Sequence, residues 1–109
     1  MSEIAELTKK LIDFRDARDW KQFHDPKDLA IALSIESSEL LEAFLWKSST
    51  EASKEKVKEE LADVLAYALL LANECGLDIS EILSAKIEAN NLKYPVDKVK
   101  GSARKYNEI

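Results

Sequence analysis

Residues 26–47 read PKDLAIALSIESSELLEAFLWK and residues 51–74 read EASKEKVKEELADVLAYALLLANE, and these two segments decide the fold. Both are rich in Ala, Leu, Glu and Lys, which form helices readily. In each segment the apolar residues recur every three to four positions, the period of an α-helix with one buried face. The pattern therefore predicts two long helices, over about 26–47 and about 51–74, joined by a Ser-Ser-Thr break in which Thr50 can cap the second helix.

The rest of the chain favours helix as well. Its 109 residues include two glycines and two prolines, all placed where helices would begin or end. One further helix is predicted over about 2–18 and another between Asp78 and Tyr94, with Asp78 as its N-cap. No segment alternates apolar and polar residues with the period of a strand. We therefore expect one all-α domain over 1–109, in which 96–109 form an extended C-terminal arm.

The charge balance restricts the possible partners. The chain has 16 basic and 21 acidic residues and a formal net charge of -5, so it is a poor electrostatic match for DNA or RNA. No apolar run reaches the roughly 18 residues of a membrane span, and no signal peptide is recognisable. We expect a cytoplasmic protein without a nucleic acid or membrane partner. The single cysteine, Cys75, lies in an apolar stretch and is expected to be buried.

Four carboxylates stand out because they fall on the apolar faces of the two long helices. Glu36 and Glu39 are three residues apart, as are Glu60 and Asp63, so each pair presents two acids side by side. The apolar residues that share these faces, at about 100° per residue, are Leu29, Ala32, Leu33, Leu40 and Ala43 on the first helix and Val57, Val64, Tyr67 and Leu71 on the second.

Acids that face a core need compensation, because burial and like charge both penalise the ionised form. They can share protons, pair with a base or bind a cation, and the nearest bases, Lys47 and Lys56, lie near helix ends. Carboxylates without a cysteine or a histidine at helical spacing suit Mg²⁺ or Mn²⁺. Iron would favour Glu-x-x-His pairs, and zinc also favours nitrogen or sulfur ligands, whereas His24 lies outside both helices. From spacing alone, a metal site and an acidic surface are equal alternatives.

With these carboxylates, the sequence resembles the MazG-like all-α nucleoside triphosphate pyrophosphatases, specifically the short branch that includes the dCTP pyrophosphatases. The family pattern, Glu-x-x-Glu followed by Glu-x-x-Asp, is present as Glu36-Ser-Ser-Glu39 and Glu60-Leu-Ala-Asp63. The resemblance extends in order along nearly the whole chain, through Arg18-Asp19-Trp20, Phe23-His24, Phe44-Leu45-Trp46, Tyr67, Lys86, Asn90, Lys93-Tyr94-Pro95, Lys100-Gly101 and Lys105-Tyr106.

The resemblance implies a four-helix bundle completed by homodimerisation, commonly as a dimer of dimers. It also implies Mg²⁺-dependent cleavage of a nucleoside triphosphate, dCTP or a related dNTP, to the monophosphate and pyrophosphate, which cleanses the nucleotide pool. Glu36, Glu39, Glu60 and Asp63 would hold the metal, and Glu36 or Glu39 would take a proton from the attacking water.

The resemblance also implies a substrate site. The predicted substrate-binding residues are Trp20, His24, Trp46 and Tyr67 around the base, together with Asn90, Lys93 and Tyr94 near the C-terminus. Ordinary packing is the alternative for each aromatic residue. Two other functions stay open: a non-catalytic helical dimeric interaction module, and a redox metal-carboxylate protein, which the missing Glu-x-x-His pairs disfavour. The base preference is not fixed by these motifs.

Overall fold

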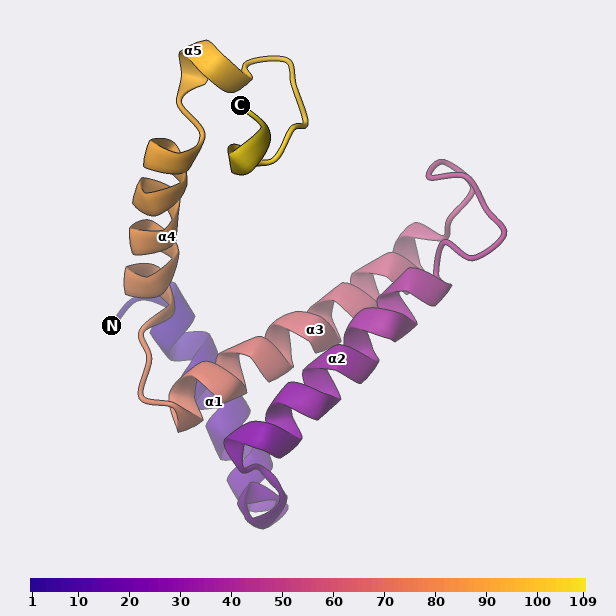
Figure 1. The fold of residues 1–109 in the computed structure, drawn as a ribbon. Coiled ribbons are helices and arrows are strands. Elements are labelled where there is room, and N and C mark those ends of the chain that lie inside the picture. The colour runs from indigo at the N-terminus through magenta and orange to yellow at the C-terminus, as the bar shows by residue number, and fades with distance from the viewer. The chain divides into compact units, whose positions relative to one another are not determined.

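The computed structural model describes residues 1–105 and 107–109, so Tyr106 of the family pattern lies outside the described residues. Within the described residues all regular elements are helices (Figure 1), as the sequence predicted. The chain forms two compact units, Met1–Leu77 and Asp78–Ile109, each with its own internal contacts. The predicted single domain and the bundle completed by a second copy stay predictions.

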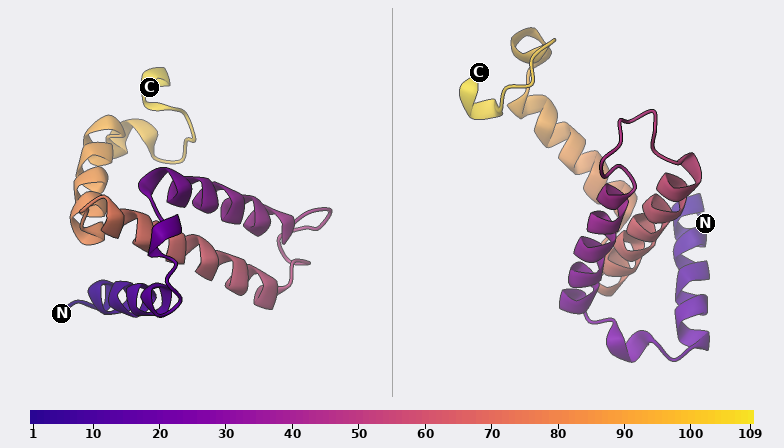
Figure 2. Two further views of the ribbon diagram at one scale, coloured as in Figure 1. Left: turned by 90° about the horizontal axis from the view of Figure 1, so that it is seen from below. Right: turned by 90° about the vertical axis from the view of Figure 1, so that its right-hand side faces the viewer.

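The first unit is built on a helical hairpin. It contains α1 (Glu3–Ala17), a short 3₁₀ turn η1 (Lys21–Phe23), α2 (Pro26–Glu42) and α3 (Lys54–Glu74). Helices α2 and α3 run side by side, and α1 packs against α3 (Figures 1 and 2). This arrangement places one face of α3 against α2 and another against α1, so residues from all three helices can meet around α3.

Short polar side chains set the helix starts. Ser2 accepts a hydrogen bond from the Ala5 backbone N–H at 3.1 Å, and Asp25 accepts one from Asp28 at 2.8 Å, just before Pro26. Each cap satisfies an N–H group that has no partner inside its helix. At the other end of α3, Gly76 has a φ of +67°, and the Leu77 N–H reaches the Ala72 carbonyl at 2.8 Å. This bond closes a left-handed turn at Gly76, so one of the two glycines ends a helix, as their placement predicted.

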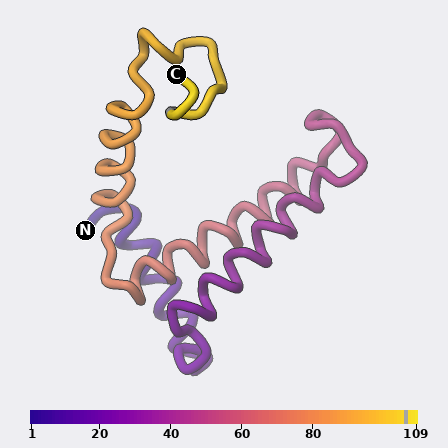
Figure 3. Tube along the Cα trace, in the orientation of Figure 1, coloured from indigo at the N-terminus to yellow at the C-terminus, as the bar shows by residue number. Residues whose placement is uncertain are grey.

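The connection between α2 and α3 differs from the prediction. Helix α2 ends at Glu42 rather than near 47, and α3 begins at Lys54 with Ser53 as its cap, instead of near 51 with Thr50. After Glu42 the Phe44 and Leu45 N–H groups donate to carbonyls three residues back, which is no longer the α-helical pattern. Before α3 a local turn forms, in which the Ser48 N–H donates to the Glu51 carboxylate at 3.2 Å and the Ser48 Oγ accepts from the Glu51 N–H at 3.3 Å. These bonds hold the connector in a loop, traced in Figure 3.

The second unit contains α4 (Ile79–Lys93) and a short helix, α5 (Val96–Val99). Asp78 caps α4 as predicted, since its carboxylate accepts a hydrogen bond from the Glu81 N–H at 3.0 Å. The prediction of an extended arm over 96–109 is wrong at its beginning, because Val96–Val99 coil into a helical turn after Pro95. Pro95 ends α4 and has the fixed φ that suits the start of a new turn.

The buried core is small. The buried hydrophobic residues include Leu29, Ala43, Leu70 and Ala72. Large apolar side chains are exposed at helical spacing on three helices: Ile31 and Ile35 on α2, Leu61 and Leu65 on α3, and Leu83 and Ile87 on α4. Cys75, predicted to be buried, is exposed because it lies where α3 ends. Among the helices described, none is long and apolar enough to cross a bilayer.

Candidate functional site

Three of the four predicted carboxylates come together between α2 and α3. Glu36 of α2 and Glu60 and Asp63 of α3 each have an oxygen within 4.8 Å of the others. Glu60 is buried, Glu36 is half-buried and Asp63 is exposed. The side-by-side packing of α2 and α3 thus brings Glu36 of one sequence pair next to both members of the other pair.

Glu39, the fourth predicted carboxylate, is half-buried and interacts with Glu36. The pKa of Glu36 is raised from 4.5 to about 7, first by a hydrogen bond with Glu39, then by burial, and then by the negative charges of Glu39, Asp63 and Glu60. A proton shared between two acids removes one of the charges that would otherwise repel each other. Without a cation, the cluster therefore retains a proton up to near-neutral pH.

Lys56 supplies a positive charge beside the cluster that the pattern of apolar faces did not predict. Its Nζ lies 2.8 Å from Glu60 Oε1, and this hydrogen bond and charge raise the pKa of Lys56. The four-residue spacing of Lys56 and Glu60 on one helix was the available signal. The pattern of apolar faces places Lys56 only near a helix end.

The cluster still has unpaired oxygens. Oε2 of Glu36 and Oε2 of Glu60 are both buried, and neither has a hydrogen-bond partner within the described part of the chain. An unpaired buried carboxylate oxygen is costly, and a hard cation with oxygen ligands would satisfy it. The donor set of Glu36, Glu60 and Asp63 therefore fits a divalent cation, and Glu39 is available as a further oxygen ligand beside Glu36.

A pocket of about 300 Å³ adjoins the cluster within the first unit. Its walls come from α1, from the connector after it and from α3, and Asp63 belongs to both the pocket and the carboxylate cluster. Three predicted substrate-binding residues line it: Trp20, His24 and Tyr67. The structure thus joins the predicted base-binding residues to the predicted metal-binding residues through one shared side chain.

The aromatic residues of the pocket contact one another edge to face. The Trp20 ring lies 5.7 Å from the Phe14 ring at 74°, and the His24 ring lies 6.4 Å from the Tyr67 ring at 63°. Burial raises the pKa of Tyr67, and the charges of Glu36, Asp63 and Glu39 raise it further, so its hydroxyl keeps its proton. His24 Nδ1 is buried and has no hydrogen-bond partner among the residues described, which leaves a polar atom for a ligand.

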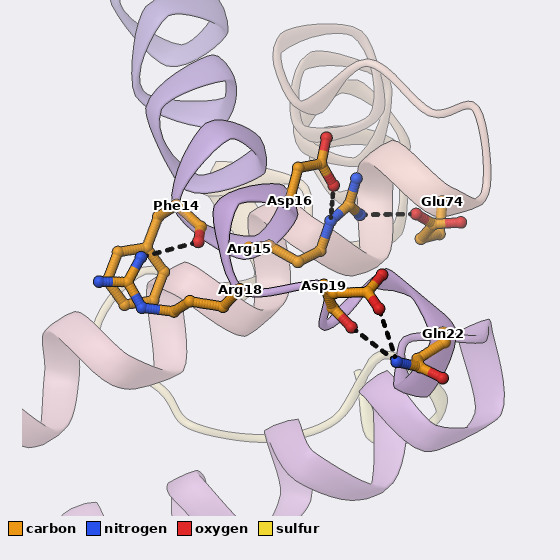
Figure 4. Close-up of polar contacts among 7 residues, drawn as sticks. All are labelled: Phe14, Arg15, Asp16, Arg18, Asp19, Gln22 and Glu74. Carbon is orange, nitrogen blue, oxygen red and sulfur yellow. Dashed lines mark hydrogen bonds and ion pairs between the residues drawn. The ribbon is translucent and has the colours of Figure 1, made fainter.

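Arg15 of α1 is a pocket residue that sequence reasoning missed. It is buried, with 3% of the residue exposed, and it pairs with Glu74 of α3 (Figure 4). The available signal was its position four residues after Leu11, on the apolar stripe of the first helix. The stripe shows that Arg15 faces inward, but its partner is 59 positions away in the sequence.

The other predicted substrate residues lie elsewhere. Trp46 is on the loop after α2, where it is 93% exposed with a φ of +63°, and it is not among the residues that line this pocket. Asn90, Lys93 and Tyr94 belong to the second unit, at the end of α4. The substrate contacts of these four residues stay predictions.

The family model of the MazG-like family matches residues 31–109, and the chain belongs to that family. Within it the chain belongs to the dCTP pyrophosphatase-like branch, as the motifs predicted. It is 42% identical to dCTP pyrophosphatase 1 of Mus musculus over 114 residues, covering 97% of this chain and 67% of that protein. The human protein of the same name is 37% identical, with the same coverage.

A solved structure is similar along most of the chain. It is a pyrophosphatase from Archaeoglobus fulgidus, 42% identical in sequence, with a TM-score of 0.81. The match covers 87% of this chain and 94% of the archaeal chain. The chain is therefore similar to this solved structure both in sequence and in backbone fold.

Proposed function

We propose that this protein hydrolyses deoxynucleoside triphosphates, dCTP or a related dNTP, to the monophosphate and pyrophosphate, in a reaction that needs Mg²⁺ or, in its place, Mn²⁺. Its class, nucleotide pyrophosphohydrolase, follows from its similarity to the dCTP pyrophosphatases and to the archaeal pyrophosphatase. One observation carries the proposal: a carboxylate cluster with unpaired buried oxygens shares Asp63 with an aromatic pocket.

The cluster would hold the metal through Glu36, Glu39, Glu60 and Asp63. Four acids alone would repel a triphosphate, so the fit of the cluster to a cation is needed for substrate binding. When bound, a divalent cation would neutralise phosphate charge and stabilise the charge that develops on the leaving pyrophosphate.

Glu36 and Glu39 are the candidates for the general base. A base works best when its pKa is near the working pH, because it is then ionised yet still attracts a proton. The pKa of Glu36, about 7, meets that condition, and Glu39 lies beside it to share the proton. We assign the removal of a proton from the attacking water to this pair.

The pocket would bind the base. A volume of about 300 Å³ is at the lower end of the range for small-molecule sites. Trp20 offers a ring for stacking, and His24 Nδ1 offers an unpaired polar atom. As the family resemblance implies, we assign Tyr67 and Trp46 to the base as well, and we propose Asn90, Lys93 and Tyr94 as further substrate contacts.

We also propose that copies of the chain associate as a dimer or a dimer of dimers. Large apolar side chains are exposed at helical spacing on α2, α3 and α4, and exposed patches of this kind mark interfaces between proteins. Sedimentation of the protein tests this. The biological role would be to cleanse or balance the dNTP pool in the cytoplasm.

Pyrophosphate release from a panel of dNTPs, rNTPs and base-modified dNTPs with Mg²⁺ tests the function. Glu39→Gln should abolish release while the helix content measured by circular dichroism is kept. Glu55→Gln is the matched control, because Glu55 is an exposed acid on α3 outside the cluster. Full activity in Glu39→Gln would contradict the proposal.

The alternative, a non-catalytic interaction module, makes a different prediction. It predicts no pyrophosphate release and no rise in melting temperature with nucleotide. A ligand at about 100 times its dissociation constant would instead add about 2.7 kcal/mol to the free energy of unfolding.

A further inference from the structure

Arg15 is a buried cation that the proposed chemistry leaves without a role. The residue is 3% exposed and lines the same pocket as Trp20, His24 and Tyr67. Most of the neighbouring wall is apolar, with Leu11 of α1 and Leu70 of α3 among its residues. A buried guanidinium in an apolar wall is costly unless its donors find acceptors.

Two carboxylates fix the position of the guanidinium. Its Nη1 donates to Glu74 Oε1 at 2.8 Å, and its Nε donates to Asp16 Oδ1 at 3.0 Å (Figure 4). Glu74 lies on α3 and Asp16 on α1, so the group is held from both helices. A planar guanidinium held at two edges loses little further freedom when it binds an additional acceptor.

The third nitrogen of the guanidinium, Nη2, is available to donate to a ligand. Among the residues that the structure describes, hydrogen bonds reach Nε and Nη1 of Arg15 and none reaches Nη2. His24 Nδ1, on the same pocket, is a second polar atom without a partner. Both groups would be satisfied by a ligand that carries polar atoms on the edge of a ring.

We propose that Arg15 determines base specificity by donating a hydrogen bond from Nη2 to a carbonyl oxygen of the nucleobase. This inference rests on the proposed function, because it takes the pocket to be the base site. A guanidinium can only donate. It therefore favours cytosine, whose ring carbonyl oxygen is a strong acceptor, over adenine, which has no carbonyl oxygen and offers only ring nitrogens as acceptors. The bases selected are those with a carbonyl oxygen at the edge that faces Arg15.

The test is the ratio of kcat/KM for dCTP to kcat/KM for dATP, measured by pyrophosphate release. The unaltered protein should favour dCTP. Arg15→Met keeps an apolar stem of similar length but removes the donors, and it should lower the ratio by about 10- to 100-fold, the value of a hydrogen bond from a charged donor. Because Arg15→Met leaves Glu74 without its partner, Arg15→Met/Glu74→Met provides a second variant. Replacing both members of a buried ion pair by apolar residues is often tolerated.

Two controls separate base recognition from the helix-to-helix contact. Glu74→Gln keeps the guanidinium and an acceptor for Nη1, so the ratio should be kept. Lys9→Met removes an exposed ion pair on the same helix, Lys9 Nζ to Asp13 Oδ2 at 2.8 Å, and should also keep it. Arg15→Lys should recover part of the ratio, because it restores a charged donor without the planar group.

Two outcomes would overturn the proposal for Arg15: an unchanged ratio in both Arg15→Met variants, or an equal fall in Glu74→Gln, which would make the helix contact the cause. If the unaltered protein releases pyrophosphate from no nucleotide, the proposed function itself fails, and the proposal for Arg15 fails with it. If the unaltered protein is active but both Arg15→Met variants keep its dCTP-to-dATP ratio, the proposal for Arg15 fails and the proposed function stands.

Discussion

The carboxylate cluster and the aromatic pocket share Asp63, but they are built from the sequence in different ways. The cluster comes from two pairs of acids, each three residues apart, on adjacent helices. The pocket joins α1, the connector after it and α3, and the Arg15–Glu74 pair beside it spans 59 positions. Local spacing therefore predicts the first site well, whereas the second depends on how α1 packs against α3.

The largest effect is expected from a change of Asp63, the residue that the cluster and the pocket share. Asp63→Asn removes a charge from the cluster and alters the pocket edge, so kcat/KM for pyrophosphate release should fall by about 10²–10⁴-fold, the range seen when a key electrostatic group is lost. Metal affinity measured by calorimetry without nucleotide should fall as well. Asp63 is exposed, so the fold should be kept. Activity within a few-fold of the unaltered protein would show that the cluster is not the reaction centre.

A change confined to the pocket should weaken nucleotide binding and leave metal binding unchanged. Trp20→Leu removes the ring that meets Phe14, and the loss of base stacking should raise KM by about 5- to 150-fold, equivalent to about 1–3 kcal/mol. Metal affinity without nucleotide should not change, because Trp20 is outside the carboxylate cluster. An equal loss of metal affinity in Trp20→Leu would contradict the separation of the two regions.

The pH dependence of stability should come from the cluster. The pKa of Glu36 is raised to about 7 in the folded chain, from 4.5, so between these pH values the folded state holds a proton that the unfolded state has released. The free energy of unfolding contributed by Glu36 is therefore greatest at low pH, and it is lost as pH rises through about 7.

Chemical denaturation with a chelator present measures this effect. The unaltered protein should lose stability relative to Glu36→Gln between about pH 5 and pH 8. Excess Mg²⁺ should reduce the loss at high pH, because a cation replaces the proton as the compensating charge. If the free energy of unfolding depends on pH in the same way in both proteins, the group with the raised pKa is not Glu36.

The same contrast explains what the sequence could and could not predict. Helix periodicity and short caps identified the helices and placed Glu36 and Glu60 on inward faces, because these signals act over a few residues. The four-residue spacing of Lys56 and Glu60 indicates their ion pair, which the pattern of apolar faces alone does not predict. Arg15 could be placed on an inward face but not paired with Glu74, since periodicity indicates a face and not the neighbour that covers it.

The smallest expected effect concerns the connector between α2 and α3. Helix α3 was predicted to start near residue 51 with Thr50 as its cap, but Ser53 caps it by accepting a hydrogen bond from the Lys56 N–H at 3.3 Å. Ser53→Ala should lower the free energy of unfolding by about 1 kcal/mol, the usual cost of losing a cap. Thr50→Ala should cost less, because the side-chain hydrogen bond that Thr50 makes among the described residues, to Ser48, is exposed.

Denaturant titration of the two alanine variants measures the difference. Because Lys56 of the first turn of α3 also pairs with Glu60, fraying of the capped end should weaken that ion pair. Ser53→Ala is therefore expected to change metal affinity slightly, and Thr50→Ala is not. If Thr50→Ala costs more stability than Ser53→Ala, the helix begins where the sequence first indicated, and the local turn formed by Ser48 and Glu51 is not the reason for its later start.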